Sequence, residues 1–139
     1  DPGHGGRDPG AVGIGGLREK DITTPVSRRI QASLNARGIN AVLTRSDDRE
    51  LDLQPRVNIA ERSNADIFVS IHSNAISLSR PDVRRARFYV LVNTSMPAVL
   101  VETGFVTGRE DAARFRNPQE VNTIADGITS GILQYLNVQ

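Results

Sequence analysis

The stretch Ile67-Phe68-Val69-Ser70-Ile71 decides the fold of this chain. Four of its five residues are apolar, and a nearly continuous apolar run is typical of a strand buried on both faces in a parallel sheet. A second run of the same character, Ala98-Val99-Leu100-Val101, predicts another buried strand. His72 follows the first run and Glu102 follows the second. Because functional groups gather beyond the carboxyl ends of parallel strands, both residues are candidates for a site.

Three helices are expected around these strands. Apolar residues recur every four positions in a stretch that predicts a helix over residues 24–37, with Pro25 in its first turn. Two further helices are predicted over residues 53–63 and 118–136, and Asn117 is placed to cap the second of them. These patterns put helices both before and after each strongly apolar strand.

Two shorter apolar stretches, residues 39–43 and 88–91, are predicted to add strands to the sheet. Helices that alternate with buried strands imply an α/β fold. We therefore expect a three-layer sandwich with a mostly parallel central sheet flanked by helices. The chain has 139 residues and no linker long enough to divide it, so one domain over residues 1–139 is expected.

The composition excludes several classes of protein. The chain has no Cys, which excludes a disulfide-stapled scaffold, and its apolar runs fall far short of the roughly 20 residues of a membrane-spanning helix. Sixteen of the 17 basic residues are Arg, and Arg84, Arg85 and Arg87 raise the alternative of nucleic-acid binding. The net charge of +1 and an aromatic content of only 4% argue against that alternative. The few aromatic residues are expected in the core.

The only two His residues, His4 and His72, are predicted to lie in loops among small or polar residues. His is the commonest metal ligand and Gly permits a close approach of the backbone, so Gly3-His4-Gly5-Gly6 favours a metal site. The His-Glu-x-x-His motif is absent, and ordinary loop histidines are the alternative. Glu102 is either a capping or ion-paired carboxylate or a general base at the rim of the sheet.

The first 16 residues are rich in glycine, with seven of the 12 Gly of the chain. A dinucleotide-binding fingerprint needs Gly-x-Gly-x-x-Gly between a strand and a helix, and no register of this segment supplies it. The phosphate-loop pattern that ends in Gly-Lys-Ser/Thr is absent as well. Nucleotide binding through these motifs is therefore rejected.

Five segments resemble the motifs of zinc-dependent N-acetylmuramoyl-L-alanine amidases, the cell-separation family of bacteria. In chain order they are residues 1–11 (DPGHGGRDPGA), Glu19-Lys20-Asp21, Thr44-Arg45 with Asp48, Leu53 and Arg56, Ser70-Ile71-His72-Ser73-Asn74-Ala75, and Pro97-Ala98-Val99-Leu100-Val101-Glu102-Thr103-Gly104-Phe105. The motifs stand in the family's order and span nearly the whole chain, so the resemblance is specific.

This resemblance implies a catalytic domain in which His4, Glu19 and His72 hold one zinc ion and Glu102 is the catalytic carboxylate. Two His and one Glu are typical of catalytic zinc, which keeps a fourth position open for water. The implied reaction is hydrolysis of the amide bond between N-acetylmuramic acid and L-alanine in peptidoglycan, for cell-wall remodelling or daughter-cell separation. The alternative is a non-catalytic cell-wall-binding module of the same fold, which predicts the loss of at least one of these four residues.

The resemblance also sets expectations for location and partners. A periplasmic or extracellular position at the cell wall is expected, with peptidoglycan as the partner and a protein activator as a further one. No nucleic acid and no membrane span are expected, and the chain is expected to be a monomer.

The chain departs from the family's pattern at two places. Members carry a strand and a helix between the motif of His72 and the segment that matches residues 87–91. Here the connection is short and lacks helical periodicity, although two parallel strands need a crossover of a dozen or more residues, usually a helix. We therefore expect that Asp82 and Val83 are not neighbours in the natural protein. The family's first strand is expected to be missing before Asp1.

Overall fold

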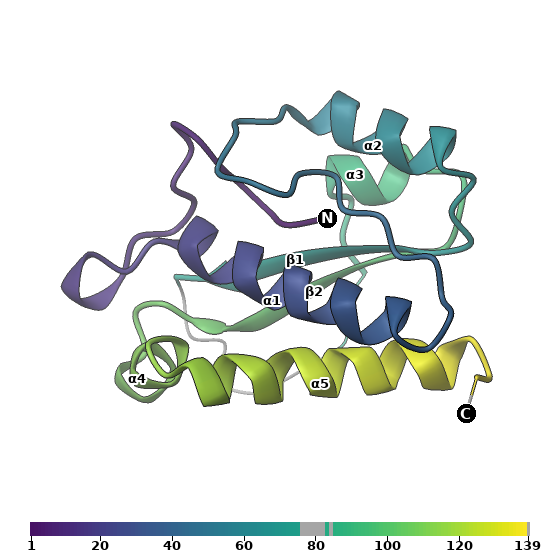
Figure 1. Ribbon diagram of the computed structural model, residues 1–139. Coiled ribbons are helices and arrows are strands. Elements are labelled where there is room, and N and C mark those ends of the chain that lie inside the picture. The colour runs from purple at the N-terminus through teal and green to yellow at the C-terminus, as the bar shows by residue number, and fades with distance from the viewer. Residues whose placement is uncertain (76–82, 84, 139) are drawn as a thin grey trace.

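The computed structural model describes residues 1–75, 83 and 85–138. Strands β1 (Phe68–Asn74) and β2 (Ala98–Phe105) pair in parallel at the centre of the molecule (Figure 1). The N-terminal segment joins the other edge of β1 through a parallel bridge between Pro2 and Ile71. The apolar run that opens β1 therefore forms a buried central strand, as its sequence predicts.

Helices cover both faces of the sheet and complete three layers (Figure 1). On one face lie α1 (Glu19–Asn35) and α5 (Pro118–Tyr135), and on the other lie α2 (Leu53–Arg62) and the short α3 (Tyr89–Val92). α4 (Arg109–Phe115) precedes α5. This is the α/β sandwich with a parallel sheet that the sequence predicts.

Each face of the sheet packs against its own apolar core. The larger core joins α1, α5 and β1, and its buried members are Ile22, Val26, Ile30, Leu34, Ile71, Val106, Phe115, Val121, Ala125 and Ile132. The smaller core joins α2, α3 and β1 through Val57, Ala60, Phe68 and Val90. Burying both faces of β1 is what fixes its carboxyl end relative to the helices.

α1 begins at Glu19, well before the predicted start, and this difference brings Glu19 into the site. The amides of the first turn find acceptors in the preceding loop: Glu19 N donates to the Ala11 carbonyl at 2.9 Å and Lys20 N donates to the Pro9 carbonyl at 3.2 Å. These bonds satisfy groups that a helix start otherwise leaves unpaired. Pro25 consequently lies inside the helix and not in its first turn.

The prediction of a strand over residues 39–43 is wrong. The backbone of Ala41 pairs with side chains of α1 instead of a neighbouring strand: Gln31 Nε2 donates to its carbonyl at 2.9 Å, and its amide donates to Asn35 Oδ1 at 2.9 Å. This segment and residues of β1 together line a cavity of about 260 Å³. An apolar segment thus lies against the core without joining the sheet.

The prediction of a strand over residues 88–91 is also wrong, because residues 89–91 belong to the helix α3 and Phe88 immediately precedes it. Val90 packs into the smaller core, whereas Phe88 is 49% and Tyr89 is 41% exposed. A short apolar run cannot by its periodicity distinguish a strand from one helical turn. Tyr135 is exposed too. Three of the six aromatic residues are therefore exposed, and for these three the prediction that aromatic residues lie in the core is wrong.

The C-terminal helix matches its prediction closely. Asn117 caps α5, since its side chain accepts a hydrogen bond from Gln119 N at 2.9 Å, and Pro118 takes the first position. α4 was not predicted, because only two of its residues are buried and so short a pattern carries little signal. Within the described residues, no helix is long and apolar enough to cross a membrane. The predicted break between Asp82 and Val83 and the predicted loss of the family's first strand before Asp1 concern positions outside the described residues, so both stay predictions.

Candidate metal centre

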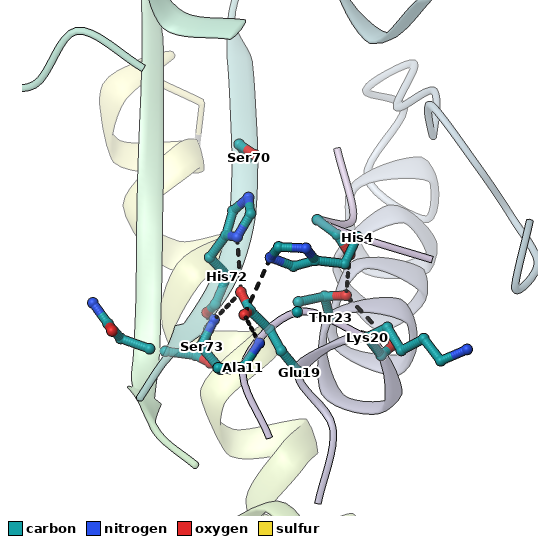
Figure 2. Close-up of polar contacts among 12 residues, drawn as sticks. His4, Ala11, Glu19, Lys20, Thr23, Ser70, His72 and Ser73 are labelled. Atoms are coloured by element: carbon teal, nitrogen blue, oxygen red, sulfur yellow. Dashed lines mark hydrogen bonds and ion pairs between the residues drawn. The ribbon is translucent and has the colours of Figure 1, made fainter. Parts of the chain in front are cut away.

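Glu19 lies at the centre of a polar cluster at the carboxyl edge of the sheet (Figure 2). Its two carboxylate oxygens accept hydrogen bonds from the backbone amides of Ala11 and Ser73, each at 2.9 Å. The same oxygens face two imidazole rings, with His72 Nδ1 at 2.8 Å from Oε1 and His4 Nε2 at 3.1 Å from Oε2. The first turn of α1, the N-terminal loop and β1 thus meet at one carboxylate.

The three side chains fit a catalytic metal ion. Each offers one ligand atom, and these atoms all lie within 4.8 Å of one another. The Glu19 side chain is only 6% exposed, and in the described part of the chain no Arg or Lys forms an ion pair with it. A buried carboxylate that faces two imidazole nitrogens is a donor set that divalent zinc accepts. The His4 and His72 side chains, 24% and 20% exposed, leave the cluster open on one side.

The loop that carries His4 adopts an unusual backbone conformation. His4 has a φ of +60°, in the left-handed region that side chains other than Gly rarely adopt. Its ring is oriented from both sides, because Nδ1 lies 2.7 Å from Asp8 Oδ2 and Nε2 faces Glu19. A carboxylate on the second ring nitrogen is the usual way in which proteins orient a metal-binding histidine.

His72 lies within β1 rather than in a loop, which corrects its predicted surroundings. The N-terminal segment packs directly against its ring: a Cβ atom on Gly3 would lie 2.4 Å from His72 Cε1. No side chain fits at that distance, so Gly3 is needed for the close approach. The rings of His4 and His72 lie edge to face, with centroids 4.9 Å apart.

Glu102 is the register partner of His72 on the adjacent strand β2. It is exposed, and it is not one of the three groups whose ligand atoms cluster. Partial desolvation raises the pKa of its carboxyl, as does the charge of Glu19, while the neighbouring His72 and His4 oppose the shift. The structure therefore brings all four predicted residues to one edge of the sheet and separates Glu102 from the other three.

The electrostatics of the cluster favour an ionised Glu19 and a protonated His4. Burial alone would raise the pKa of Glu19, but hydrogen bonds from His4, His72 and the two backbone amides hold it well below its usual range. Burial alone would lower the pKa of His4, but hydrogen bonds to Glu19 and Asp8 outweigh it and raise the pKa. Without a metal ion, the raised pKa of His4 favours a proton on its ring that balances the charge of the buried carboxylate.

A cavity of about 190 Å³ opens beside the two histidines. Its lining combines polar and apolar residues, among them Gly3, Asp8, Glu50, Leu53, Arg56 and Val90. The larger cavity next to residues 39–43 contains none of the clustered side chains. Of these two cavities, only the smaller is lined by His4 and His72.

Reasoning from residues alone missed several parts of this site. Asp8 is one of 16 acidic residues, and nothing in its pattern marks it as the partner of His4. Ser73 contributes a backbone amide, which no side-chain pattern reveals. Glu19 was assigned only through the resemblance to a family, although its place ahead of an apolar helical pattern is the signal that marks a helix start.

The chain is thus an α/β domain that gathers two His and one Glu, a set of side chains that could hold a metal ion, at the carboxyl edge of a parallel sheet. The chain belongs to the N-acetylmuramoyl-L-alanine amidase family, whose sequence profile matches residues 1–81 and 77–134.

Relatives and solved structures agree with this membership. The N-acetylmuramoyl-L-alanine amidase LytC of Bacillus subtilis is 34% identical over 171 aligned positions, which cover 97% of this chain but only 34% of LytC. The amidase AmiC2 of Nostoc punctiforme has a TM-score of 0.92 at 44% identity, covering 99% of this chain and 94% of that one. The CwlD amidase of Clostridioides difficile, solved in complex with the GerS lipoprotein, has a TM-score of 0.89 at 27% identity, covering 100% and 97% of the two chains.

Proposed function

We propose that this domain is a zinc-dependent N-acetylmuramoyl-L-alanine amidase that hydrolyses the amide bond between the lactyl group of N-acetylmuramic acid and L-alanine in peptidoglycan. One observation carries the proposal. This chain belongs to the amidase family, and it brings the ligand atoms of His4, Glu19 and His72 within 4.8 Å of one another. Glu102 is the register partner of His72 on the adjacent strand. A cell-wall-binding module has no need of such a cluster.

His4 Nε2, His72 Nδ1 and the Glu19 carboxylate are the groups that would hold the metal ion. Zinc, when bound, would polarise the substrate carbonyl and lower the pKa of water, so that the water can act as a nucleophile at neutral pH. The protein's part is to keep the three ligands together through Asp8, Ala11 and Ser73, which fix the orientations of His4 and Glu19.

Glu102 is the proposed general base and acid. Its carboxylate would take a proton from the attacking water as the oxygen bonds to the carbonyl carbon, and would return it to the nitrogen as the carbon–nitrogen bond breaks. The products are a lactyl carboxylate and the free amine of L-alanine. The raised pKa of Glu102 is a shift in the direction that favours this role, because a carboxylate that binds a proton more readily is a better acceptor for the proton of the water.

The substrate would reach these groups through the cavity of about 190 Å³, which is lined by both histidines. Leu53 and Val90 supply apolar surface there, against which the methyl groups of the substrate would pack. The scissile bond would then lie between the cavity and Glu102.

A substrate in the cell wall implies a location in the periplasm or outside the cell. Because CwlD was solved in complex with the GerS lipoprotein, we propose that a protein activator is a further partner of this domain. We propose that the domain acts as a monomer, since all four assigned residues come from one chain.

The chain forms one catalytic domain over residues 1–139, and we propose that the natural protein has an additional segment between Asp82 and Val83. Two observations support this. The family profile matches in two separate stretches, residues 1–81 and 77–134, which overlap at residues 77–81. The alignment with LytC runs over 171 positions although this chain has 139 residues, so LytC has residues in the aligned region that this chain lacks. Reading the coding sequence across these two codons in the source gene tests it, and adjacent codons would contradict it.

The amidase assignment is tested with purified cell-wall sacculi. The zinc-loaded protein should release stem peptides with a free N-terminal L-alanine, and treatment with a strong chelator should stop the release until zinc is restored. Binding to sacculi without any release, in protein that holds about one zinc per chain, would favour the wall-binding alternative and overturn the proposal.

A further inference from the structure

We propose that Arg45 and Arg56 are positioning residues that hold the backbone of the metal ligand His4. This inference rests on the proposed function, because it assigns the two guanidinium groups to the metal site. Both side chains are almost fully buried, with Arg45 1% and Arg56 3% exposed. Taken as whole residues, they have the smallest exposed fractions of the charged residues in the described part of the chain.

Every N–H group of the Arg45 side chain donates to a neutral acceptor. Nε donates to the Pro2 carbonyl at 3.0 Å, Nη2 donates to the Gly3 carbonyl at 2.7 Å, and the remaining bonds go to Thr23, Thr24 and the Asp47 carbonyl. Within the described ranges, no carboxylate forms an ion pair with Arg45. Burying an unpaired charge is costly, so a role that an apolar side chain cannot fill accounts best for this arginine.

Arg56 approaches the same loop from α2. Its Nη1 donates to the Pro2 carbonyl at 2.6 Å and to Asp1 Oδ1 at 2.8 Å, and its Nη2 donates to the His4 carbonyl at 2.9 Å. Its Nε donates to the Leu51 carbonyl, which ties α2 to the loop that precedes it. Three successive carbonyls of the N-terminal segment, those of Pro2, Gly3 and His4, thus accept from two guanidinium groups.

These bonds hold the two peptide planes that flank His4. A peptide unit is planar, so fixing the Gly3 carbonyl orients the plane before the His4 Cα atom, and fixing the His4 carbonyl orients the plane after it. Arg45 and Thr23 hold the first plane, with Thr23 Oγ1 donating to the Gly3 carbonyl at 2.9 Å, and Arg56 holds the second. Because His4 has a φ of +60°, which a relaxed chain seldom adopts, external bonds are needed to keep it there.

The loop also lies in direct contact with the Arg45 side chain. A Cβ atom on Gly5 would lie 2.9 Å from Arg45 Nε and 2.3 Å from the Arg49 carbonyl, and Gly5 itself has a φ of +130°. The residue that follows the ligand must therefore be Gly if Arg45 is to stay in place. The contact is an independent sign that the loop is shaped around this guanidinium.

The experiment compares zinc affinity with stability. Arg45→Lys and Arg56→Lys keep the positive charge but remove the planar fork of donors, so each should weaken zinc binding roughly 10-fold or more in competition with a chromophoric chelator. Leu34→Ala is the matched control, because Leu34 is buried at the far end of α1. It should lower the melting temperature of the metal-free protein comparably while leaving the zinc affinity within about twofold.

Two further measurements keep the test decisive if Arg45→Lys does not fold. Thr23→Val removes the donor to the Gly3 carbonyl and the acceptor of one Arg45 N–H group, and it should weaken zinc binding about fivefold or more, the effect of losing one or two hydrogen bonds. In metal-free protein, Arg56→Lys should speed amide hydrogen exchange at Gly3 and Gly5 more than Leu34→Ala does at equal stability. These two amides donate to the Ile71 and Asp8 carbonyls only while the loop keeps its shape.

The outcomes separate the two proposals. Wild-type protein that binds no zinc would overturn the proposed function and this inference with it. Wild-type protein that binds zinc, alongside arginine variants that bind it as tightly as Leu34→Ala does, would overturn the positioning role alone.

Discussion

His72 and Glu102 are register partners on the neighbouring parallel strands β1 and β2. Paired residues in adjacent strands point to the same face of a sheet, and the strands lie roughly 4.8 Å apart. The pairing therefore holds the His72 imidazole and the Glu102 carboxylate on neighbouring strands, while the other two clustered groups come from α1 and the N-terminal loop. This division of the site between strands and helix permits separate tests of metal binding and of proton transfer.

Glu102→Gln should retain zinc and the fold while losing amidase activity by about 100-fold or more, because the amide can neither accept nor return the proton. Turnover on soluble muropeptides and metal content are measured on the same preparation. Glu110→Gln is the control, since Glu110 is exposed on α4 and its loss removes the same charge. Near wild-type turnover in Glu102→Gln would remove Glu102 from the mechanism.

His4→Ala and His72→Ala should each lose most of the bound zinc, because two remaining protein ligands hold the ion poorly. Glu19→Gln should weaken zinc binding while leaving the hydrogen bond from Ser73 N in place, since the amide oxygen still accepts it. Elemental analysis after dialysis gives the zinc content of each variant. Full occupancy in both His variants would contradict the assignment of the ligands.

The metal-free protein should show a pH-dependent contribution from the His4–Asp8 pair. The pKa of His4 in the folded chain is raised above its ordinary value of 6.5, because hydrogen bonds to Glu19 and Asp8 outweigh the opposing effect of burial. A raised folded pKa stabilises the fold fully below the unfolded value, and the stabilisation is lost as the pH rises through the folded value. Asp8→Asn should therefore lower the melting temperature more at pH 6 than at pH 8.5.

The two pH values are compared by calorimetry in the presence of a chelator, so that zinc does not mask the effect. Asp8→Asn retains an oxygen that can accept from Gly10 N, which keeps the turn intact. Asp66→Asn serves as the control, because Asp66 is exposed and precedes the amino end of β1, whereas the cluster lies at the carboxyl end. An equal shift at both pH values would show that Asp8 acts on the fold without regard to the protonation of His4.

The sequence predicts the positions of both strands, because each contains a run that is apolar almost throughout, and β1 and β2 form at these runs. The prediction that both strands are buried holds for β1 only. None of the residues of β2 is fully buried and Val99 is 53% exposed, so the prediction of a buried second strand is wrong. Residues 39–43 are apolar as well, but their backbone pairs with Gln31 and Asn35 of α1, and no local pattern reveals such bonds. The strand predicted over residues 88–91 is wrong for a different reason. Only Val90 is buried among the four residues of α3, and one buried residue in four is compatible with a helical turn as well as with a strand.

The candidate site is predictable from residues only in part. His4, His72 and Glu102 stand out because histidines are rare in this chain and because two of these residues follow apolar runs. Glu19 does not stand out, since its role depends on hydrogen bonds from Ala11 and Ser73 that form only when a loop and a strand meet the first turn of α1. Arg45 and Arg56 belong to a segment that resembles a family motif, but no sequence pattern indicates that they are buried against the loop of His4, which is known only from the structure.

Leu53 and Val57 lie four residues apart on α2 but should respond differently to truncation. Val57 is 3% exposed and packs in the smaller core, so Val57→Ala should lower the free energy of unfolding by about 2 kcal/mol. Leu53 is 52% exposed and lines the cavity beside the histidines, so Leu53→Ala should change stability by less than about 0.5 kcal/mol.

The effect of Leu53→Ala should appear in catalysis instead. If the substrate packs against Leu53 equally in the ground and transition states, KM rises while kcat is unchanged. Denaturant unfolding and steady-state kinetics on soluble muropeptides measure the two effects, and an unchanged KM in Leu53→Ala would mean that the substrate does not occupy this cavity.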